Sequence, residues 1–277
     1  MTIRRDSVAV VTGAGSGIGR ALAKRLAAEG IAGLAIADVN REGLEETASM
    51  LGDKKVSQHF VDVSDREAMH AFVDAVIGEH GRVTHVINNA GVALGGTLRE
   101  VTLDEIEWLM SINFWGVVHG TKLFMPHLEK EQSAHIVNIS SLFGFVAPPG
   151  QTAYCASKFA VRGFTEAVRH ELEGTNIAVS SVHPGGVRTN IANSARIAAN
   201  TEHTAEEIER RLKRMNRNLS TTTPDRAAEI IIKGIKKRSP RIIVGPDAQL
   251  LSWIQRLFPN RYLAIANAIS GGKLKET

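Results

Sequence analysis

The sequence predicts an α/β fold built on a doubly wound, seven-stranded parallel sheet with helices on both faces, in three α/β/α layers. Three observations predict it. Seven short apolar runs rich in valine and isoleucine alternate with longer amphipathic stretches up to about residue 246. A glycine-rich turn joins the first run to the first helical stretch. Small or polar residues follow the strands, where open sheets of this kind place their binding sites.

The composition excludes several classes of protein. The 277 residues are 43% hydrophobic and 22% charged, and 33 basic against 29 acidic residues give a net charge of +4. The basic residues are scattered and match no nucleic-acid-binding motif, so we expect no nucleic-acid partner. The one cysteine, Cys155, excludes an internal disulfide framework, which favours a reducing, cytoplasmic location. No run approaches the roughly 18 consecutive apolar residues of a membrane-spanning helix.

The first strand, turn and helix indicate a nucleotide site. Residues 7–11 predict a buried strand, and the following helix places Leu22 and Leu26 on one face and ends at Gly30. Between them, residues 13–19 carry glycines in the pattern Gly-x3-Gly-x-Gly. Glycines there let the backbone approach a pyrophosphate, whose negative charge the helix N-terminus favours. An ordinary tight turn is the alternative.

The second strand, residues 34–38, ends at Asp38. This aspartate lies nineteen residues after Gly19, close to the spacing of an acid that binds the adenosine ribose hydroxyls. Its carboxylate would repel a 2′-phosphate, which favours NAD over NADP. Capping of the next helix is the alternative role.

The third strand, residues 56–61, leads into Asp62 and Val63. The helix after it is predicted to begin with Ser64 as its N-cap, and Glu67 three residues later completes a capping box. For Asp62, a local capping role is nearly as well supported as a functional one.

Asparagines mark the middle of the chain. The fourth strand, residues 83–87, runs into Asn-Asn-Ala-Gly at residues 88–91, which is either a simple turn or part of a site. Residues 103–127 predict one long helix, although Asn113 inside it is a poor helix former. The alternative is that Asn113 is a surface residue without a functional role.

Three groups that could do chemistry come next. Residues 135–141 predict a buried strand that ends in hydroxyls, the last at Ser141. Tyr154 and Lys158 lie four residues apart in a helix that ends at Gly174, so they share a face. A free tyrosine has a pKa of about 10, and forming phenolate at pH 7 costs about 4 kcal/mol, which a nearby ammonium group reduces. Chance spacing of a surface lysine and a half-buried tyrosine is the alternative.

The last third of the chain completes the sheet. Residues 177–182 predict the sixth strand, residues 223–236 a helix, and residues 241–244 the last strand. His183, just after the sixth strand, is expected to be a packed residue rather than a catalyst. The apolar, turn-rich residues 142–150 are expected to form one wall of a substrate pocket or to pack against the next helix.

Two segments have weaker patterns. Residues 190–222 are the least regular, and pairs at i,i+4 spacing in their later half predict a solvated helix. These pairs are Glu206–Arg210, Glu207–Arg211 and Glu209–Lys213. Residues 247–277 predict an amphipathic helical extension. It either packs on its own subunit or a neighbour, or it covers a greasy substrate entrance or rests weakly on a membrane surface.

The order of these motifs resembles the short-chain dehydrogenase/reductase family over about residues 5–245. The central match is Ser-x12-Tyr-x3-Lys at Ser141, Tyr154 and Lys158, and Pro-Gly-x-Val-x-Thr at residues 184–189 is another. The resemblance implies a Rossmann-type catalytic domain over residues 1–246, an NAD cofactor and no metal. It also implies that residues 190–222 form a lid over the substrate.

The resemblance implies roles for four catalytic residues. Tyr154 would be the general acid/base, Lys158 would lower the tyrosine pKa and bind the nicotinamide ribose, and Ser141 would polarise the substrate oxygen. The backbone carbonyl of Asn113 would hold a water that joins the lysine to solvent, and would bend or interrupt its helix.

Residues implied for cofactor binding come from five loops and from the helix that carries Tyr154 and Lys158. They are Gly13, Ser16, Gly17, Ile18, Gly19, Asp38, Asp62, Val63, Asn89, Ala90, Gly91, Tyr154, Lys158, Pro184, Gly185, Val187 and Thr189. The Asn-Asn-Ala-Gly motif would mainly stabilise the sheet. Ser16 and Val39 occupy positions where NADP-using relatives often carry a base, which adds to the preference for NAD.

The expected activity is hydride transfer between NAD and a hydrophobic secondary alcohol or its ketone. The resemblance implies a homodimer or homotetramer joined through the long helices. Two alternatives stay open: a catalytically idle NAD-binding regulator, and a protein peripheral to a membrane through residues 247–277.

Overall fold

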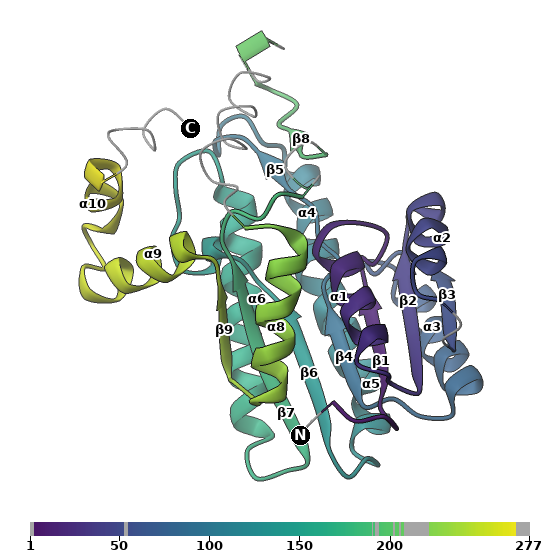
Figure 1. Ribbon diagram of the computed structural model, residues 1–277. Helices are drawn as coiled ribbons and strands as arrows, with labels where there is room; N and C mark the ends of the chain where they lie inside the picture. The colour runs from purple at the N-terminus through teal and green to yellow at the C-terminus, as the bar shows by residue number, and fades with distance from the viewer. Residues whose placement is uncertain are drawn as a thin grey trace.

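The chain folds around one seven-stranded parallel sheet (Figure 1). The computed structural model describes residues 3–52, 55–189, 191, 194–201, 203–204, 206–207 and 222–269. The strand order is β3-β2-β1-β4-β6-β7-β9, so the winding reverses between β1 and β4. The strands are β1 Val8–Thr12, β2 Gly33–Asp38, β3 Val56–Phe60, β4 His85–Asn88, β6 Ala134–Ile139, β7 Ile177–Pro184 and β9 Arg241–Val244. The predicted doubly wound α/β class is confirmed.

Helices cover both faces of the sheet, as expected. One layer holds α1, Gly17–Ala28, α2, Arg41–Ser49, and α8, Pro224–Lys236. The other holds α3, Arg66–His80, together with the two helices α5 and α6. Figure 1 shows α1 and α8 side by side over the same face.

The side chains of β1 alternate between the two faces of the sheet, so one strand packs against both helix layers. Ala9 and Val11 pack into the cluster under α1 and α8, whereas Val8 and Val10 pack into the cluster under α3 and α5. Successive side chains of a strand point to opposite faces, so a strand covered on both sides must be apolar throughout. The short apolar runs of the sequence follow from this burial.

The predicted long helix over residues 103–127 is instead three consecutive pieces. These are α4, Leu103–Met110, a π-helical turn, Ser111–Trp115, and α5, Gly116–Leu128. Asn113 lies within the π turn, so the expected local interruption of the helix is confirmed. Its side chain is fully buried, and a surface asparagine is therefore wrong.

Two further features differ from expectation. The N-cap of α3 is Asp65, whose carboxylate accepts from Glu67 N and Ala68 N, so the predicted capping box at Ser64 is wrong. Ser64 instead donates its backbone N–H and its hydroxyl to the Asp62 carboxylate. An aspartate one residue later competed for the cap, because its charge also suits the positive end of the helix.

The segment 190–222 is described only in part. Its strand β8, Arg196–Ile197, pairs with β5, Leu94–Gly95, in a two-stranded parallel sheet. Strands of two residues carry no readable alternation, which is why the sequence did not predict them. The partners at positions 209–213 of the three predicted ion pairs lie outside the described residues, so the solvated helix stays a prediction.

Helix α6 and the C-terminal extension complete the fold. α6 spans Thr152–Glu171, preceded by a 3₁₀ turn over Leu142–Gly144. The extension forms α9, Pro246–Leu257, and α10, Tyr262–Ile269, beside the carboxyl end of β9 (Figure 1). None of the helices in the described part of the chain combines the length and apolar character needed to cross a bilayer.

Candidate active site

The structure brings the four predicted catalytic residues together at the carboxyl ends of the central strands. Ser141 follows β6, Tyr154 and Lys158 lie in the first turns of α6, and Asn113 lies in the π turn. The Lys158 Nζ is 5.7 Å from the centre of the Tyr154 ring, and the Ser141 and Tyr154 side chains share a hydrogen bond. Gly91 lies against both Asn113 and Lys158, because an added Cβ would be 3.1 Å from Asn113 Oδ1 and 3.3 Å from Lys158 Nζ.

Burial controls the charges of this cluster. It raises the pKa of Tyr154 to about 12, although the hydrogen bond with Ser141 opposes the shift. It also lowers the pKa of Lys158 to about 8. Desolvation of the phenolate therefore dominates the Tyr154 pKa in this structure, and the lowering of that pKa by Lys158 stays a prediction. Near pH 7 the hydroxyl of Tyr154 is a proton donor beside a mostly charged ammonium group.

Asn113 is held by its side chain. Its Oδ1 accepts from Val92 N at 2.8 Å, and its Nδ2 donates to Val92 O at 3.0 Å and to Ser157 Oγ at 3.2 Å. In the π turn, Gly116 N donates five residues back, to Ser111 O. Such turns disturb the regular ladder and frequently lie at functional sites.

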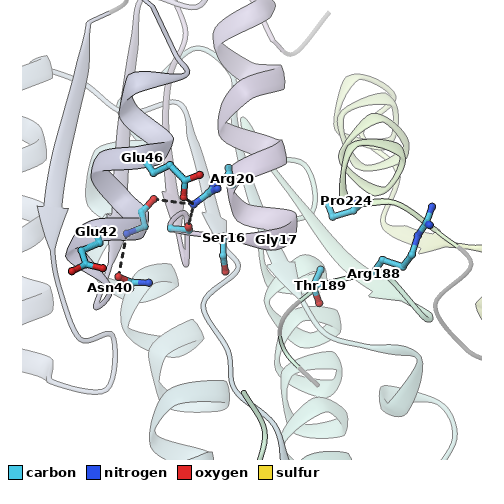
Figure 2. Close-up of a pocket in the computed structure, with 11 residues that line it drawn as sticks. Ser16, Gly17, Arg20, Asn40, Glu42, Glu46, Arg188, Thr189 and Pro224 are labelled. Carbon is cyan, nitrogen blue, oxygen red and sulfur yellow. Dashed lines mark hydrogen bonds and ion pairs between the residues drawn. The ribbon is translucent and has the colours of Figure 1, made fainter. Parts of the chain in front are cut away.

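A pocket of about 410 Å³ lies beside the glycine turn (Figure 2). Its lining comes from four elements far apart in the sequence. The lining residues are Gly15, Ser16, Gly17, Arg20, Asn40, Glu42, Gly43, Glu46, Arg188, Thr189 and Pro224. The glycine turn, the start of α2 and the residues after β7 thus meet where the strand order reverses, as open α/β sheets require of a nucleotide site.

The glycine turn fits a pyrophosphate. An added Cβ on Gly15 would lie 2.9 Å from Asp38 Oδ2, and one on Gly19 only 2.0 Å from Gly13 O. Ser16 is the N-cap of α1 without a side-chain cap hydrogen bond, so the helix N-terminus is left for another acceptor. The residues present therefore fit a nicotinamide dinucleotide.

Asp38 ties the turn to the start of α2. Its carboxylate accepts from Gly15 N at 2.7 Å and from Asn40 N at 2.9 Å. The helix cap is Asn40, whose side chain accepts from Gly43 N, so the alternative role of Asp38 as a helix cap is wrong. The carboxylate still lies against Gly15, a pocket residue.

Arg20 and Glu46 line the same pocket, and the sequence did not single them out. Arg20 donates to Glu46 at 2.6 Å, to Gly15 O at 2.5 Å and to Thr47 Oγ1 at 2.9 Å, as Figure 2 shows in part. The position of Arg20, one residue after Gly19, was a signal available in the sequence. The contact with Glu46 spans 26 residues and was not.

The Asn-Asn-Ala-Gly motif supports the sheet, in line with its expected structural role. Asn88 Nδ2 donates to Asn138 Oδ1 at 2.8 Å, across β4 and β6. Asn89 Nδ2 donates to Thr12 O at 2.9 Å and to Gly13 O at 3.1 Å, which joins the motif to the glycine turn. Ala90 N donates to Thr12 Oγ1 at 3.1 Å.

The loop of residues 184–189 closes the pocket. Gly185 N donates to Val244 O at 2.8 Å, and Arg188 N to Thr222 O at 2.9 Å. Thr189 lies against the glycine turn, since a Cβ on Gly17 would be 3.1 Å from its Cγ2. The two predicted nucleotide motifs therefore touch although about 170 residues separate them.

His183 is a buried strand residue, as expected. Its Nδ1 lies 3.0 Å from Ser141 O and its Nε2 2.9 Å from Ser181 Oγ. Burial lowers its pKa to about 4, so it is neutral at pH 7. In the described part of the chain, no three His, Cys, Asp or Glu residues gather in a group able to hold a metal.

Comparisons with known proteins agree with this geometry. A family model described as short chain dehydrogenase matches residues 7–200. SadH of Mycobacterium tuberculosis, provisionally named an oxidoreductase, is 43% identical over 97% of this chain and 96% of its own length. A 3-ketodihydrosphingosine reductase of Bacteroides thetaiotaomicron is 33% identical over 90% of this chain and 94% of its own. A short-chain dehydrogenase/reductase from Burkholderia phymatum, solved in complex with NAD, has a TM-score of 0.82 and 31% identity, with 91% and 93% covered.

Proposed function

Because this chain belongs to the short-chain dehydrogenase/reductase family of oxidoreductases, we propose that it interconverts a hydrophobic secondary alcohol and its ketone with NAD. The observation that carries the proposal is the cluster of Ser141, Tyr154 and Lys158, with Asn113 behind Gly91. An idle nucleotide-binding regulator has no need of a proton donor, a cation and a hydroxyl in one place. We therefore prefer the enzyme.

The residues divide the chemistry of ketone reduction. When bound, the nicotinamide ring supplies the hydride, which adds to the carbonyl carbon. The Tyr154 hydroxyl gives its proton to the carbonyl oxygen, and Ser141 holds that oxygen by a hydrogen bond. The Lys158 ammonium stabilises the phenolate that remains, and water near Asn113 returns the proton. Alcohol oxidation runs through the same groups in reverse.

The cofactor preference rests on carboxylates. Asp38, Glu42 and Glu46 lie at or line the end of the pocket nearest α2. The cation there, Arg20, is already paired with Glu46. A 2′-phosphate would meet these negative charges, whereas ribose hydroxyls can donate to Asp38. The Burkholderia phymatum relative was solved with NAD, which supports the same choice.

The substrate class follows from the loop of residues 142–150. Leu142, Phe145 and Val146 are buried in a cluster of apolar side chains, and the Phe143 ring packs edge-on against Tyr154 with centroids 6.0 Å apart. A wall of this kind favours an apolar ketone over a charged one. The name of the Bacteroides thetaiotaomicron reductase supports a lipid-like ketone.

A panel of ketones and alcohols with NADH, NADPH and their oxidised forms tests the proposal by absorbance of the reduced nicotinamide. We expect turnover of medium-chain and long-chain ketones such as 2-decanone, with kcat/KM for NADH at least tenfold above that for NADPH. Faster turnover with NADPH would overturn the cofactor preference. Binding of NADH without turnover of any panel member would favour the regulator.

We further propose a homo-oligomer in the cytoplasm that touches membranes weakly through its extension. Trp115 and Phe159 expose 51% and 39% of their surface beside the long helices α5 and α6, which suits a self-association surface. On α9, Trp253 and Leu257 expose 60% and 64%, with Arg256 beside the Trp253 ring. Aromatic, apolar and basic side chains on one helix suit an anionic membrane surface.

A further inference from the structure

The C-terminal extension contacts two loops of the active site. α9 reaches the 184–189 loop and α10 reaches the 142–150 loop. We propose that Asp247 and Tyr262 are positioning residues, which hold these loops in the geometry that binds the nicotinamide and the substrate. This inference rests on the proposed function.

Asp247 does not serve its own helix. It follows Gly245 and Pro246 in the first turn of α9, but the helix has no side-chain cap hydrogen bond. Its Oδ2 instead accepts from Gly186 N at 2.7 Å, across 61 residues. An aspartate in a first turn is also favoured by the helix dipole.

The space around Asp247 is shaped for a carboxylate. An added Cβ on Gly185 would lie 2.2 Å from Oδ2, and one on Gly245 would lie 2.5 Å from Oδ1. Gly245 also has φ +101°, a conformation that other residues rarely adopt. Two glycines thus leave room for this one side chain between β9 and the 184–189 loop.

Stability alone does not explain the carboxylate. Its Oδ1 is buried and has no hydrogen-bond partner among the described residues. Burying a carboxylate oxygen without a partner opposes folding. The contact that offsets this cost is the bond from Gly186 N to Oδ2, which holds the 184–189 loop.

The loop depends on this contact. The other hydrogen bonds that hold residues 184–189 join backbone atoms, from Gly185 to Val244 and between residues 186–188 and Thr222. Gly186 N is the donor directly before Val187, the residue expected to contact the nicotinamide carboxamide. Loss of the Asp247 acceptor would leave Gly186 N without its partner, and the backbone bonds at Gly185, Gly186 and Arg188 would hold the loop alone.

Tyr262 fixes the second loop. Its hydroxyl accepts from Ala147 N at 3.0 Å, across 115 residues, and its ring packs with the cluster that contains Leu142 and Phe145. Pro148 and Pro149 follow and have no N–H, so Ala147 is the last backbone donor before Gly150. The Tyr262 hydroxyl therefore holds the last backbone donor before Gly150, whose carbonyl accepts from Gly96 N at 2.9 Å.

Asp247 is tested by NADH titration of the full-length chain, followed by fluorescence. Asp247→Ala should raise the Kd for NADH at least tenfold. Asp247→Asn should stay within threefold of wild type, because the amide oxygen still accepts from Gly186. Trp253→Ala, on the exposed side of the same helix, should leave the Kd unchanged.

Tyr262 is tested by hydrogen exchange and mass spectrometry of peptides that cover residues 142–150. Tyr262→Phe removes only the acceptor, so exchange of the Ala147 amide should be at least tenfold faster, with the NADH Kd kept. The Trp253→Ala control should exchange as wild type does.

Several outcomes would overturn the inference. Wild-type NADH affinity in Asp247→Ala would show that Asp247 has no positioning role. Unchanged exchange in Tyr262→Phe would show the same for Tyr262. If Asp247→Ala does not fold, Asp247→Asn decides alone: a tenfold weaker NADH affinity would contradict a role that only needs an acceptor. A wild-type chain that binds neither NADH nor NADPH would overturn the proposed function and the Asp247 role with it, while hydrogen exchange would still decide the Tyr262 contact.

Discussion

The pKa values of Tyr154 and Lys158 shift in opposite directions for one reason. Each side chain loses water around its charged form, so the phenol pKa rises to about 12 and the ammonium pKa falls to about 8. The hydrogen bond between Ser141 and Tyr154 opposes the first shift but does not cancel it. The pair therefore holds a protonated phenol, and stabilisation of phenolate by the cation matters only once the proton has left.

Replacing Tyr154 by phenylalanine tests its role as the proton donor. Tyr154→Phe should lower kcat for ketone reduction by about 10² to 10⁴-fold, the usual contribution of a general acid. The Kd for NADH should change little, because the hydroxyl is the only group removed. Steady-state kinetics and fluorescence titration measure the two effects. Turnover near that of wild type would show that another group supplies the proton.

At the scale of elements, local sequence signals compete with one another. Thr102 caps α4 with Glu105 in a complete capping box, whereas the similar pattern at Ser64 loses to Asp65. Asn113 interrupts a helix because its side chain bonds to Val92, which lies in a different part of the chain. Each outcome depends on which partner the fold brings within reach.

Helix α9 of the extension has one buried face and one exposed face. Ala248 and Ile254 are buried, whereas Trp253 and Leu257 face outward. The variant Trp253→Glu with Leu257→Glu should abolish flotation with vesicles that contain anionic lipid, because carboxylates replace the apolar contact and repel the surface. The NADH Kd is the control and should be kept. Flotation equal to wild type would end the membrane proposal.

The proposed self-association concerns the whole molecule. Trp115 and Phe159 are large exposed side chains of a kind that oligomer interfaces bury. Trp115→Glu should convert the proposed homo-oligomer to a monomer, since a charge buried at an interface without a partner is strongly unfavourable. Light scattering after size exclusion measures the mass, with Leu103→Glu, at an exposed position of α4, as the control. An unchanged mass would place the interface elsewhere.

Buried histidines link the stability of the whole fold to pH, and burial lowers the pKa most in three of them, while it also lowers the pKa of His59 and of His80. Burial lowers the pKa of His85 to about 4, of His135 to about 3 and of His183 to about 4. In the unfolded chain histidines take up protons near pH 6.5, whereas the folded ones do not until much lower pH. The unfolding free energy should therefore fall as pH drops below about 6.5, by about 1 kcal/mol per histidine and pH unit.

Urea unfolding between pH 7.5 and 5 measures this slope. His135→Gln removes one buried site and should flatten the dependence by less than about a third, because His59 and His80 contribute as well. His170→Gln, whose parent side chain is 64% exposed, should leave the slope unchanged. A slope that is the same in the His135 variant would show that other groups carry the acid sensitivity.

Features that are local in the chain could be predicted from the sequence. Periodicity in the apolar runs and amphipathic stretches located the seven strands and the main helices, because burial on both faces of a strand or one face of a helix leaves its mark within a few residues. Glycines at 13–19 and the four-residue spacing of Tyr154 and Lys158 predicted the nucleotide turn and the acid/base pair. Both depend on backbone geometry over one or two turns.

Tertiary structure alone decided which distant residues meet. The contacts of Asp247 with Gly186 and of Tyr262 with Ala147 span 61 and 115 residues. No pattern near either residue distinguishes it from a helix aspartate or a packed tyrosine. The Tyr154 pKa was likewise beyond the sequence, because spacing shows that a cation is near but not how much water burial removes.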